Sequence, residues 1–394
     1  MNLKYAKRMN NMKASEIREL LKVAAQPGII SFGGGFPAPE LFPVEEMVAV
    51  SKQVIEEKGS QALQYGPTEG YQPLREAIAK RMEKMQAFVE AKDILVTSGS
   101  QQGLDFSAKL FINPGDTIIL EKPSYLGAIN AFKAYEPNFI DIELEDDGMN
   151  MDQLEEALNT GSNVKFIYVI PDFQNPSGKT WSVEKRKKLV ELGNKYDVAI
   201  IEDNPYGELR FEGELLPSIK HFDTDGRVIY LGTFSKILCP GFRLGWIAAS
   251  PEILNKYVLM KQGADLQSST ISQMEVAMFL QKYDIEKHIE KIKEVYLRRR
   301  NLMINVMKEE FPEGVKYTIP EGGLFTWVTL PDHINTRDLA AKALEKKVAF
   351  VPGGSFYANG GHENSMRLNY SAMEDDKIVE GMKLLADVIK EEMK

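Results

Sequence analysis

The sequence is poor in cysteine and histidine. Cys239 is the only cysteine among 394 residues. No intramolecular disulfide can therefore form, and a reducing compartment such as the cytoplasm is expected. The four histidines, at positions 221, 288, 333 and 362, fall in no motif. Because no group of residues has metal-ligand spacing, no metal site is expected.

Long apolar runs and basic stripes are also missing. No stretch approaches the roughly 20 apolar residues that a membrane span needs, and the first residues lack the apolar core of a signal peptide. The net charge of −9, without a basic stripe, argues against a nucleic-acid partner. We therefore expect a cytoplasmic protein with neither a membrane nor a nucleic-acid partner. Its length allows a large core and a second lobe.

Residues 232–246 carry the strongest chemical signal in the sequence. Thr233 and Ser235 precede Lys236, and Arg243 follows the lysine by seven positions. Hydroxyls and a guanidinium bind phosphate, and an amine near cationic groups readily forms a Schiff base with an aldehyde. An aldehyde and a phosphate on one molecule indicate pyridoxal 5'-phosphate (PLP). The alternative, two surface charges near a strand end, is disfavoured by the apolar runs on either side.

The pattern Thr-Phe-Ser-Lys-x6-Arg-x-Gly at residues 233–245 resembles the lysine segment of fold-type I PLP-dependent aminotransferases of class I/II. It is most similar to the branch with 2-aminoadipate and kynurenine aminotransferases, and the resemblance covers nearly the whole chain. It implies an α/β fold whose large domain has a mostly parallel, doubly wound sheet, with a smaller α+β domain. We expect an N-terminal arm and part of the small domain in 1–45, the large PLP-binding domain in 46–285, and the small C-terminal domain in 286–394. Within the large domain, residues 253–280 are predicted to be helical.

Two predicted strands end in polar side chains that the chemistry of PLP needs. Asp203 follows the apolar run 198–201, where a carboxylate is poorly placed for solvation. A buried carboxylate there can keep the ring nitrogen of PLP protonated, and a solvated surface aspartate is the alternative. Tyr206 can donate to the phenolic oxygen of the cofactor. Asn175, in a turn after the run 164–170, can donate to the same oxygen and to the substrate carboxylate.

Two further strand ends are predicted to complete the cofactor site. Ser100 and Gln101 begin a helix, whose N-terminus offers unpaired N–H groups and a partial positive charge. We expect them to hold the phosphate opposite Ser235 and Arg243, although a plain N-cap serine explains the pattern equally well. Tyr125 follows another strand and can stack on the pyridine ring.

The resemblance also implies the substrate contacts. Arg367, in a Met-Arg-Leu stretch, would grip the α-carboxylate as a bidentate fork, and a structural ion pair is the alternative. The glycine-rich segment at Gly35 would pass beside the substrate. Arg18, on a helical arm, would reach the distal end of the substrate, unless the arm only packs on the body. Tyr65 would cross a dimer interface to the partner's cofactor phosphate, whereas its spacing alone favours an ordinary exposed tyrosine.

These residues predict an aminotransferase in which Lys236 forms the aldimine with PLP and works in a ping-pong sequence. The expected donors are L-amino acids such as 2-aminoadipate, aromatic or leucine-like amino acids and glutamate, and the expected acceptors are 2-oxo acids such as 2-oxoglutarate. Tyr65 implies a homodimer with shared active sites. One alternative is a PLP β-lyase or related enzyme of the same fold. Another is the ligand-sensing module of a transcription regulator, which is disfavoured because about 15 residues before the arm leave no room for a helix-turn-helix.

Overall fold

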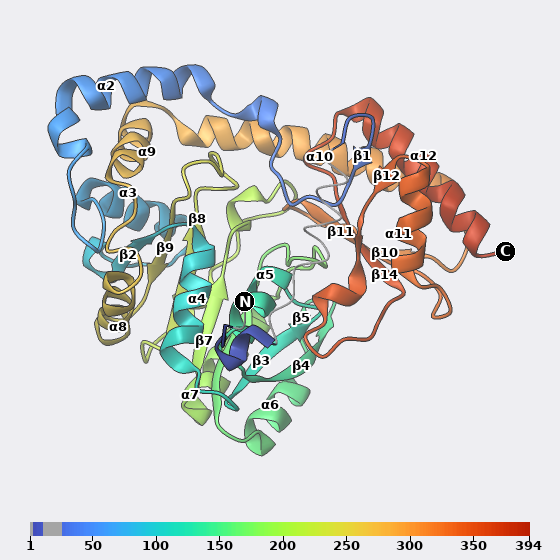
Figure 1. Cartoon of the computed structure of the whole chain (residues 1–394), viewed down its shortest axis with the longest axis horizontal. Helices are drawn as coiled ribbons and strands as arrows, with labels where there is room; N and C mark the ends of the chain where they lie inside the picture. Colours follow the sequence, from blue (N-terminus) through green and yellow to red (C-terminus); the bar gives the residue numbers. More distant parts are fainter. Residues whose placement is uncertain (1–2, 11–25) are drawn as a thin grey trace.

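The computed structural model describes residues 3–10 and 26–394, which form two lobes (Figure 1). Helix α10 (Ile285–Glu310) runs from one lobe to the other. Asp284 caps this helix, because its side chain accepts from the backbone N–H groups of Glu286 and Lys287. Its apolar residues recur every three or four positions, which buries one face of the helix along both lobes.

The larger lobe is built on an eight-stranded sheet with the order β2-β9-β8-β7-β6-β3-β4-β5. Strands β8, β7, β6, β3 and β4 pair in parallel, whereas β9 and β5 run antiparallel to their neighbours. This confirms the expected mostly parallel sheet. The strands are β2 (Ile94–Thr97), β3 (Thr117–Lys122), β4 (Asn138–Glu145), β5 (Gly148–Met149), β6 (Val164–Val169), β7 (Ala199–Asp203), β8 (Val228–Thr233) and β9 (Gly245–Ala248).

Helices cover both faces of this sheet, because its strands are apolar on both sides. In β6, Phe166 and Tyr168 join one buried cluster, while Ile167 and Val169 join a second cluster across the sheet. This alternation is the period of two that a strand imposes on its side chains. The helices of this lobe are α2 (Val44–Ala62), α3 (Gln72–Met82), α4 (Ser100–Phe111), α5 (Leu126–Lys133), α6 (Met151–Thr160), α7 (Val183–Tyr196), α8 (Pro251–Gln262) and α9 (Thr270–Lys282).

The prediction of one helical stretch over 253–280 is wrong, because the chain forms two helices, α8 and α9, with a turn between them. Gly263 lies directly after α8, and Leu266 adopts the left-handed backbone conformation, with φ 66°. Ser269 then caps α9 by accepting from the N–H of Ser272. These breaks are local, so the apolar periodicity alone did not show them.

The smaller lobe contains a four-stranded antiparallel sheet with the order β10-β11-β14-β13. Strand β1 (Ile30–Ser31) pairs in parallel with β12 (Val348–Ala349), so a segment from the start of the chain joins this lobe. The domain boundaries at residues 45 and 285 stay a prediction. The remaining elements are β10 (Lys316–Tyr317), β11 (Phe325–Thr329), β13 (Val351–Pro352), β14 (Ser365–Asn369), α11 (Thr336–Glu345) and α12 (Asp375–Glu392). Within residues 3–10 and 26–394, no helix has the length and apolar character needed to cross a membrane.

Candidate active site

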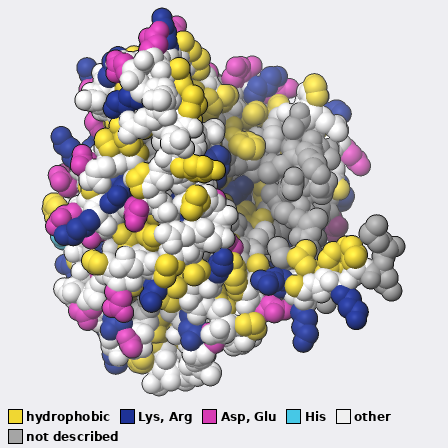
Figure 2. Space-filling model, turned by 60° about the vertical axis from the view of Figure 1, so that its left-hand side comes forward, with side chains coloured by type: hydrophobic (Ala, Val, Ile, Leu, Met, Phe, Trp, Pro, Cys, Tyr) yellow, Lys and Arg dark blue, Asp and Glu magenta, His cyan; other side chains and the backbone are white. Residues whose placement is uncertain are grey.

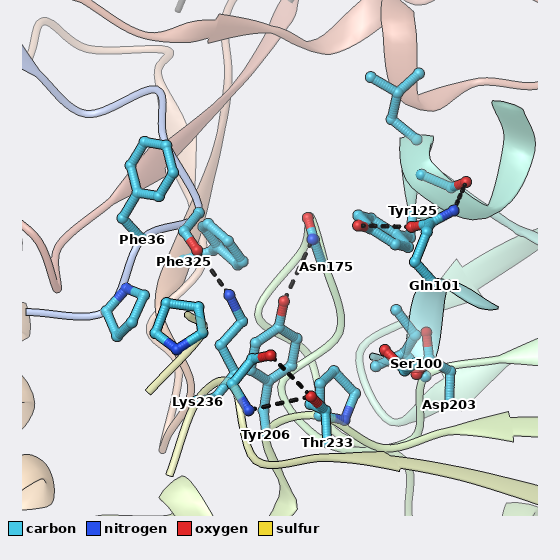
Figure 3. Close-up of a pocket in the computed structure, with 18 of the residues that line it drawn as sticks. Phe36, Ser100, Gln101, Tyr125, Asn175, Asp203, Tyr206, Thr233, Lys236 and Phe325 are labelled. Carbon is cyan, nitrogen blue, oxygen red and sulfur yellow. Dashed lines mark hydrogen bonds between the residues drawn. The ribbon is translucent and has the colours of Figure 1, made fainter. Parts of the chain in front are cut away.

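A cavity of about 490 Å³ lies where β6, β7 and β8 end, beside the start of α4 (Figure 3). Side chains at the carboxyl ends of parallel strands meet at one edge of the sheet. The cavity therefore collects twelve of the fourteen residues that the sequence indicated. These are Gly35, Ser100, Gln101, Tyr125, Asn175, Asp203, Tyr206, Thr233, Ser235, Lys236, Arg243 and Arg367.

Lys236 follows β8 and projects into the cavity (Figure 3). Its Nζ donates to the carbonyl oxygen of Gly35 at 2.7 Å. Burial lowers the pKa of Lys236 to about 8, and the positive charges of Arg367 and Arg243 add to this effect. More of this amine is therefore neutral near neutral pH than in an ordinary lysine, and the neutral amine is the form that acts as a nucleophile or a base.

Asp203 ends β7 and is only 2% exposed. Its Oδ2 accepts from the hydroxyl of Tyr168 at 2.8 Å, whereas its buried Oδ1 has no hydrogen-bond partner in the described chain. Burial raises the pKa of Asp203 to about 7, and the bond from Tyr168 partly opposes that rise. A cationic N–H group next to Oδ1 would satisfy this oxygen and favour the ionised carboxylate.

The opposite part of the cavity is suited to an anion. Helix α4 begins after Gly99 without a side-chain cap, so its first N–H groups are open to a ligand. A Cβ on Gly99 would lie 2.4 Å from Nη2 of Arg243, and only glycine allows this close approach. Arg243 has φ 52° and donates to Ser235 Oγ at 3.5 Å. Thr233 Oγ1 in turn donates to Ser235 Oγ at 2.9 Å.

Arg367 is oriented by hydrogen bonds from its two terminal nitrogens and by two aromatic rings, whereas its buried Nε has no hydrogen-bond partner in the described chain. Its Nη1 donates to Asn175 Oδ1 at 2.9 Å, and its Nη2 donates to the carbonyl oxygen of Gly33 at 2.7 Å. The guanidinium lies over the rings of Phe325 and Phe356, at 4.2 and 5.0 Å from their centroids. Burial lowers the pKa of Arg367 to about 10, which leaves it charged at neutral pH.

Polar groups of four other predicted residues lie around the same space (Figure 3). Asn175 Nδ2 donates to the Tyr206 hydroxyl at 3.4 Å, and the Asn175–Pro176 peptide bond is cis. Burial raises the pKa of Tyr206, so it remains a hydroxyl donor. The Tyr125 hydroxyl donates to Gln101 Oε1 at 3.5 Å, which links the tyrosine to the first turn of α4.

Two predicted residues are not among the side chains that line the cavity. Tyr65 is 78% exposed, and Arg18 lies outside the described residues. Conversely, three residues that contact the site were not predicted from the sequence: Tyr168, Phe325 and Phe356. Tyr168 carries a hydroxyl within the apolar run 166–170, and this was the one available signal. The two phenylalanines stand in ordinary apolar contexts, so nothing in the sequence marked their contact with Arg367.

Comparison with known proteins agrees with this geometry. Residues 28–385 match the family model for aminotransferase class I and II. The aromatic-amino-acid aminotransferase 1 of Thermococcus litoralis is 51% identical over 99% of this chain and 95% of its own length. The crystal structure of Pyrococcus horikoshii kynurenine aminotransferase has a TM-score of 0.95 and 46% identity, covering 99% of this chain and 98% of that one.

A third relative bears on the cofactor. The α-aminoadipate aminotransferase of Thermus thermophilus was solved with N-(5'-phosphopyridoxyl)-L-leucine, and it has a TM-score of 0.93 and 41% identity over 99% of this chain and 98% of its own. The chain belongs to the aminotransferase class I and II family and is a PLP-dependent enzyme of fold type I. The cavity fits this cofactor, because the unpartnered oxygen of Asp203, the amine of Lys236 and the cradle at Gly99 and Arg243 match a ring nitrogen, an aldehyde and a phosphate.

Proposed function

We propose that this enzyme moves an amino group from 2-aminoadipate, aromatic or leucine-like L-amino acids, or glutamate, to a 2-oxo acid such as 2-oxoglutarate. The observation that carries the proposal is that Arg367 and Asn175, which are hydrogen-bonded to each other, line the same cavity as Lys236 and the uncharged residues Phe36, Pro37 and Leu126. The named substrates of the relatives, which are aromatic amino acids, kynurenine and α-aminoadipate, support it.

The cofactor is held by residues from both sides of the cavity. Ser235, Thr233 and Arg243 would bind the phosphate together with Ser100 and Gln101 at the start of α4. Asp203 would keep the ring nitrogen protonated, and Tyr125 would pack on the ring. When bound, PLP would supply an electron sink for the bonds at the substrate Cα. Tyr206 and Asn175, which lie within hydrogen-bond distance of each other, would donate to its phenolic oxygen.

Lys236 moves the proton at the reacting carbon. Arg367 and Asn175 bind the α-carboxylate, and this orients the substrate Cα toward Nζ of Lys236. With a pKa of about 8, that amine can take the Cα proton near neutral pH and return it. Because Arg367 offers one carboxylate site, the first oxo acid has to leave before the second enters. This supports a ping-pong order.

The outer wall of the cavity sets the choice of side chain. Among its described lining residues are Phe36, Pro37, Leu126 and Asn130, which carry no charge. An aromatic or aliphatic side chain would bury apolar area there. The positive charges in the described lining are already assigned to the cofactor, the Cα proton and the α-carboxylate. A distal carboxylate therefore needs another cation, and we assign that role to Arg18.

We further propose that the enzyme is a homodimer in a reducing compartment, the cytoplasm. Val44 and Val48, at the start of α2, are 64% and 65% exposed, and Leu63, two positions before Tyr65, is 74% exposed. An apolar groove of about 760 Å³ lies beside Val44 and Val48, between the start of α2 and residues 239–242. On the face shown in Figure 2, hydrophobic side chains lie among positively and negatively charged ones. A second copy would cover the groove and bring Tyr65 to its neighbour's phosphate.

The two half-reactions test the activity. Each candidate amino acid is mixed with the PLP enzyme in the absence of an oxo acid, and formation of its oxo acid is measured together with the change in cofactor absorbance. 2-Oxoglutarate should then restore the original spectrum and release glutamate. Initial rates with both substrates varied should give parallel double-reciprocal lines. Steady release of pyruvate without any oxo acid would instead identify a β-lyase.

Mixing two impaired variants at limiting PLP tests the shared site. In a dimer of Tyr65→Phe with Lys236→Ala, both lesions fall in one site and the other site is complete, if Tyr65 acts across the interface. Activity should therefore rise on mixing above that of either variant alone. The absence of recovery, with subunit exchange demonstrated by mass spectrometry, would place Tyr65 outside the partner's site.

A further inference from the structure

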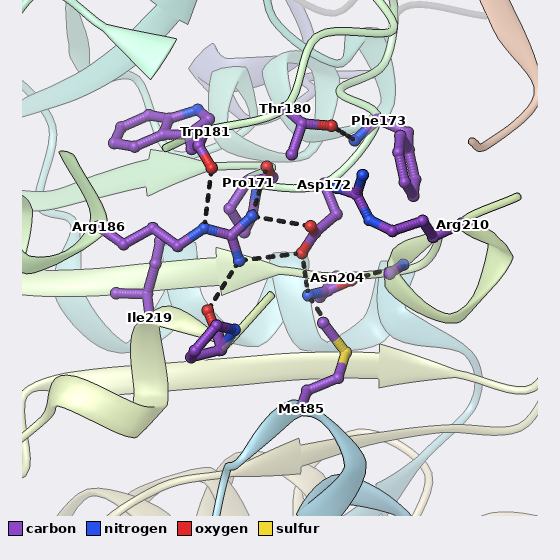
Figure 4. Close-up of polar contacts among 12 residues, drawn as sticks. Met85, Pro171, Asp172, Phe173, Thr180, Trp181, Arg186, Asn204, Arg210 and Ile219 are labelled. Carbon is purple, nitrogen blue, oxygen red and sulfur yellow. Dashed lines mark hydrogen bonds and ion pairs between the residues drawn. The ribbon is translucent and has the colours of Figure 1, made fainter. Parts of the chain in front are cut away.

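Asp172, Arg186 and Asn204 form a buried hydrogen-bond network behind the cavity, and none of the three lines it (Figure 4). Arg186 lies on α7, and its side chain is 0% exposed. Its Nη2 and Nη1 donate to the two carboxylate oxygens of Asp172 at 2.7 and 3.2 Å. The other donors of Arg186 bind the carbonyl oxygens of residues 171, 181 and 217. Every guanidinium N–H is used, so Asp172 is held rigidly.

Asn204 connects this rigid pair to the active-site turn. Its Nδ2 donates to Asp172 Oδ2 at 2.9 Å, and its Oδ1 accepts from the backbone N–H of Gly207 at 2.9 Å. Asn204 lies directly after Asp203, and Tyr206 lies within the turn that the second bond closes. A Cβ on Gly207 would be 2.5 Å from Asn204 Oδ1, so the turn is as tight as a glycine permits.

We propose that Asn204 and Asp172 are positioning residues that hold Tyr206 and Asn175 at the same point of the cavity. Asp172 belongs to the loop that carries Asn175, and Asn204 belongs to the turn that carries Tyr206. The direct contact between Asn175 and Tyr206 is 3.4 Å, longer than a strong hydrogen bond, so it cannot set their separation. The bond of 2.9 Å between Asn204 and Asp172 joins the two segments from behind.

This inference rests on the proposed function, in which Tyr206 and Asn175 donate to the phenolic oxygen of PLP. We call the hydrogen bond between Asn204 and Asp172 the clamp. If the clamp is lost, Tyr206 and Asn175 move away from that oxygen, and their hydrogen bonds to it weaken. Hydrogen-bond donors stabilise the deprotonated, negatively charged form of the phenolic oxygen. Without them the proton next to this oxygen is held more tightly, so a higher pH is needed to remove it. A purely structural role predicts lower stability without this change in titration.

The test compares Asn204→Ala and Asn204→Ser in the PLP-bound enzyme. The serine hydroxyl can still accept from the Gly207 N–H, but it is one atom shorter and does not reach Asp172. Tyr257→Phe is the control, because it removes a buried hydrogen bond between Tyr257 and Ser107, 2.7 Å apart, and neither residue lines the cavity. For each protein we measure the Tm, the pH midpoint of the cofactor absorbance, and kcat and KM separately.

Both Asn204 variants should raise the pH midpoint by about half a unit or more, and should lower kcat by about tenfold to a hundredfold with a smaller effect on KM. Tyr257→Phe should lower only the Tm. The clamp is disproved if Asn204→Ala keeps the wild-type midpoint and kcat, if Asn204→Ser matches wild type, or if Tyr257→Phe shifts the midpoint equally. A wild-type protein that binds PLP but does not transaminate would instead overturn the proposed function, and the role assigned to the clamp with it.

Discussion

At the inner end of the cavity Asp203 and Ser235 are 2% and 7% exposed, whereas at the outer end Phe36 is 60% exposed. The inner side chains extend from strand ends whose backbones are held by neighbouring strands. The outer side chains belong to loops and to the first turn of α5, whose backbones are not paired with neighbouring strands. Rigid elements keep reacting groups in place, and loops can change without disturbing the sheet.

This difference separates the two tasks of the enzyme. In the proposed function, the inner end holds the cofactor and moves the proton, and these needs are the same for every amino donor. The outer end would meet the side chain of the substrate, which differs from donor to donor. Changes at the inner end should therefore reduce all reactions together, and changes at the outer end should alter the ratio between substrates.

The largest effect is expected for Lys236→Ala. This variant removes the amine that attaches the cofactor and moves the Cα proton, so transamination should fall below detection for every donor. The visible absorbance of the attached cofactor should also disappear, while the phosphate contacts still retain some PLP. Normal transamination by the purified variant would show that the lysine is wrongly assigned.

A loss of several orders of magnitude in kcat is expected for Asp203→Asn. The amide has nearly the same shape, but it cannot stabilise the protonated ring nitrogen. PLP content, measured after denaturation in alkali, should remain close to that of wild type. All donors should lose rate by a similar factor. Turnover close to wild type would remove Asp203 from the mechanism.

Arg243→Ala should weaken PLP binding by about tenfold to a hundredfold, the value of one charge-assisted contact. The dissociation constant can be measured by titrating the cofactor-free protein. At saturating PLP, kcat should recover largely, because this arginine faces the phosphate and not the reacting carbon. Unchanged affinity for PLP would contradict the phosphate role.

Arg18→Ala should lower kcat/KM for glutamate and 2-aminoadipate by about tenfold to a hundredfold and leave aromatic and leucine-like donors nearly unchanged. The reason is that this arginine would pair with a distal carboxylate only. In the proposed function Arg18 is the outer counterpart of Arg243, and the two alanine variants test the comparison directly. Equal losses for both classes of donor would mean that Arg18 supports the arm and not the choice of substrate.

The smallest effect concerns stability. The pKa of Asp203 is about 7 in the folded protein and 3.8 for an ordinary aspartate. The folded state therefore binds this proton more tightly, and the associated stability is lost as pH rises from about 4 to about 7. Without PLP, the Tm of Asp203→Asn should rise relative to wild type across this range, and added PLP should reduce the difference. A difference in Tm that does not vary with pH would contradict the shifted pKa.

Much of this site could be predicted from the sequence because its residues lie in short, strongly constrained segments. Lys236, Asp203 and Asn175 each follow an apolar run, and parallel strands bring such ends together whatever the loops between them do. The mostly parallel sheet was implied by the resemblance to fold-type I aminotransferases. The sequence pattern did not predict the break between α8 and α9, since a left-handed residue and a capping serine leave the apolar periodicity almost unchanged.

Other features depended on contacts between distant residues. The rings of Phe325 and Phe356 reach Arg367 only because β11, β13 and β14 pair in one small sheet. Likewise, Arg186 meets Asp172 only when α7 packs against the central sheet. Local propensity and periodicity describe which groups a strand delivers to its end, because they act over a few residues. They carry no information on which groups meet across the fold, and tertiary packing alone decided that.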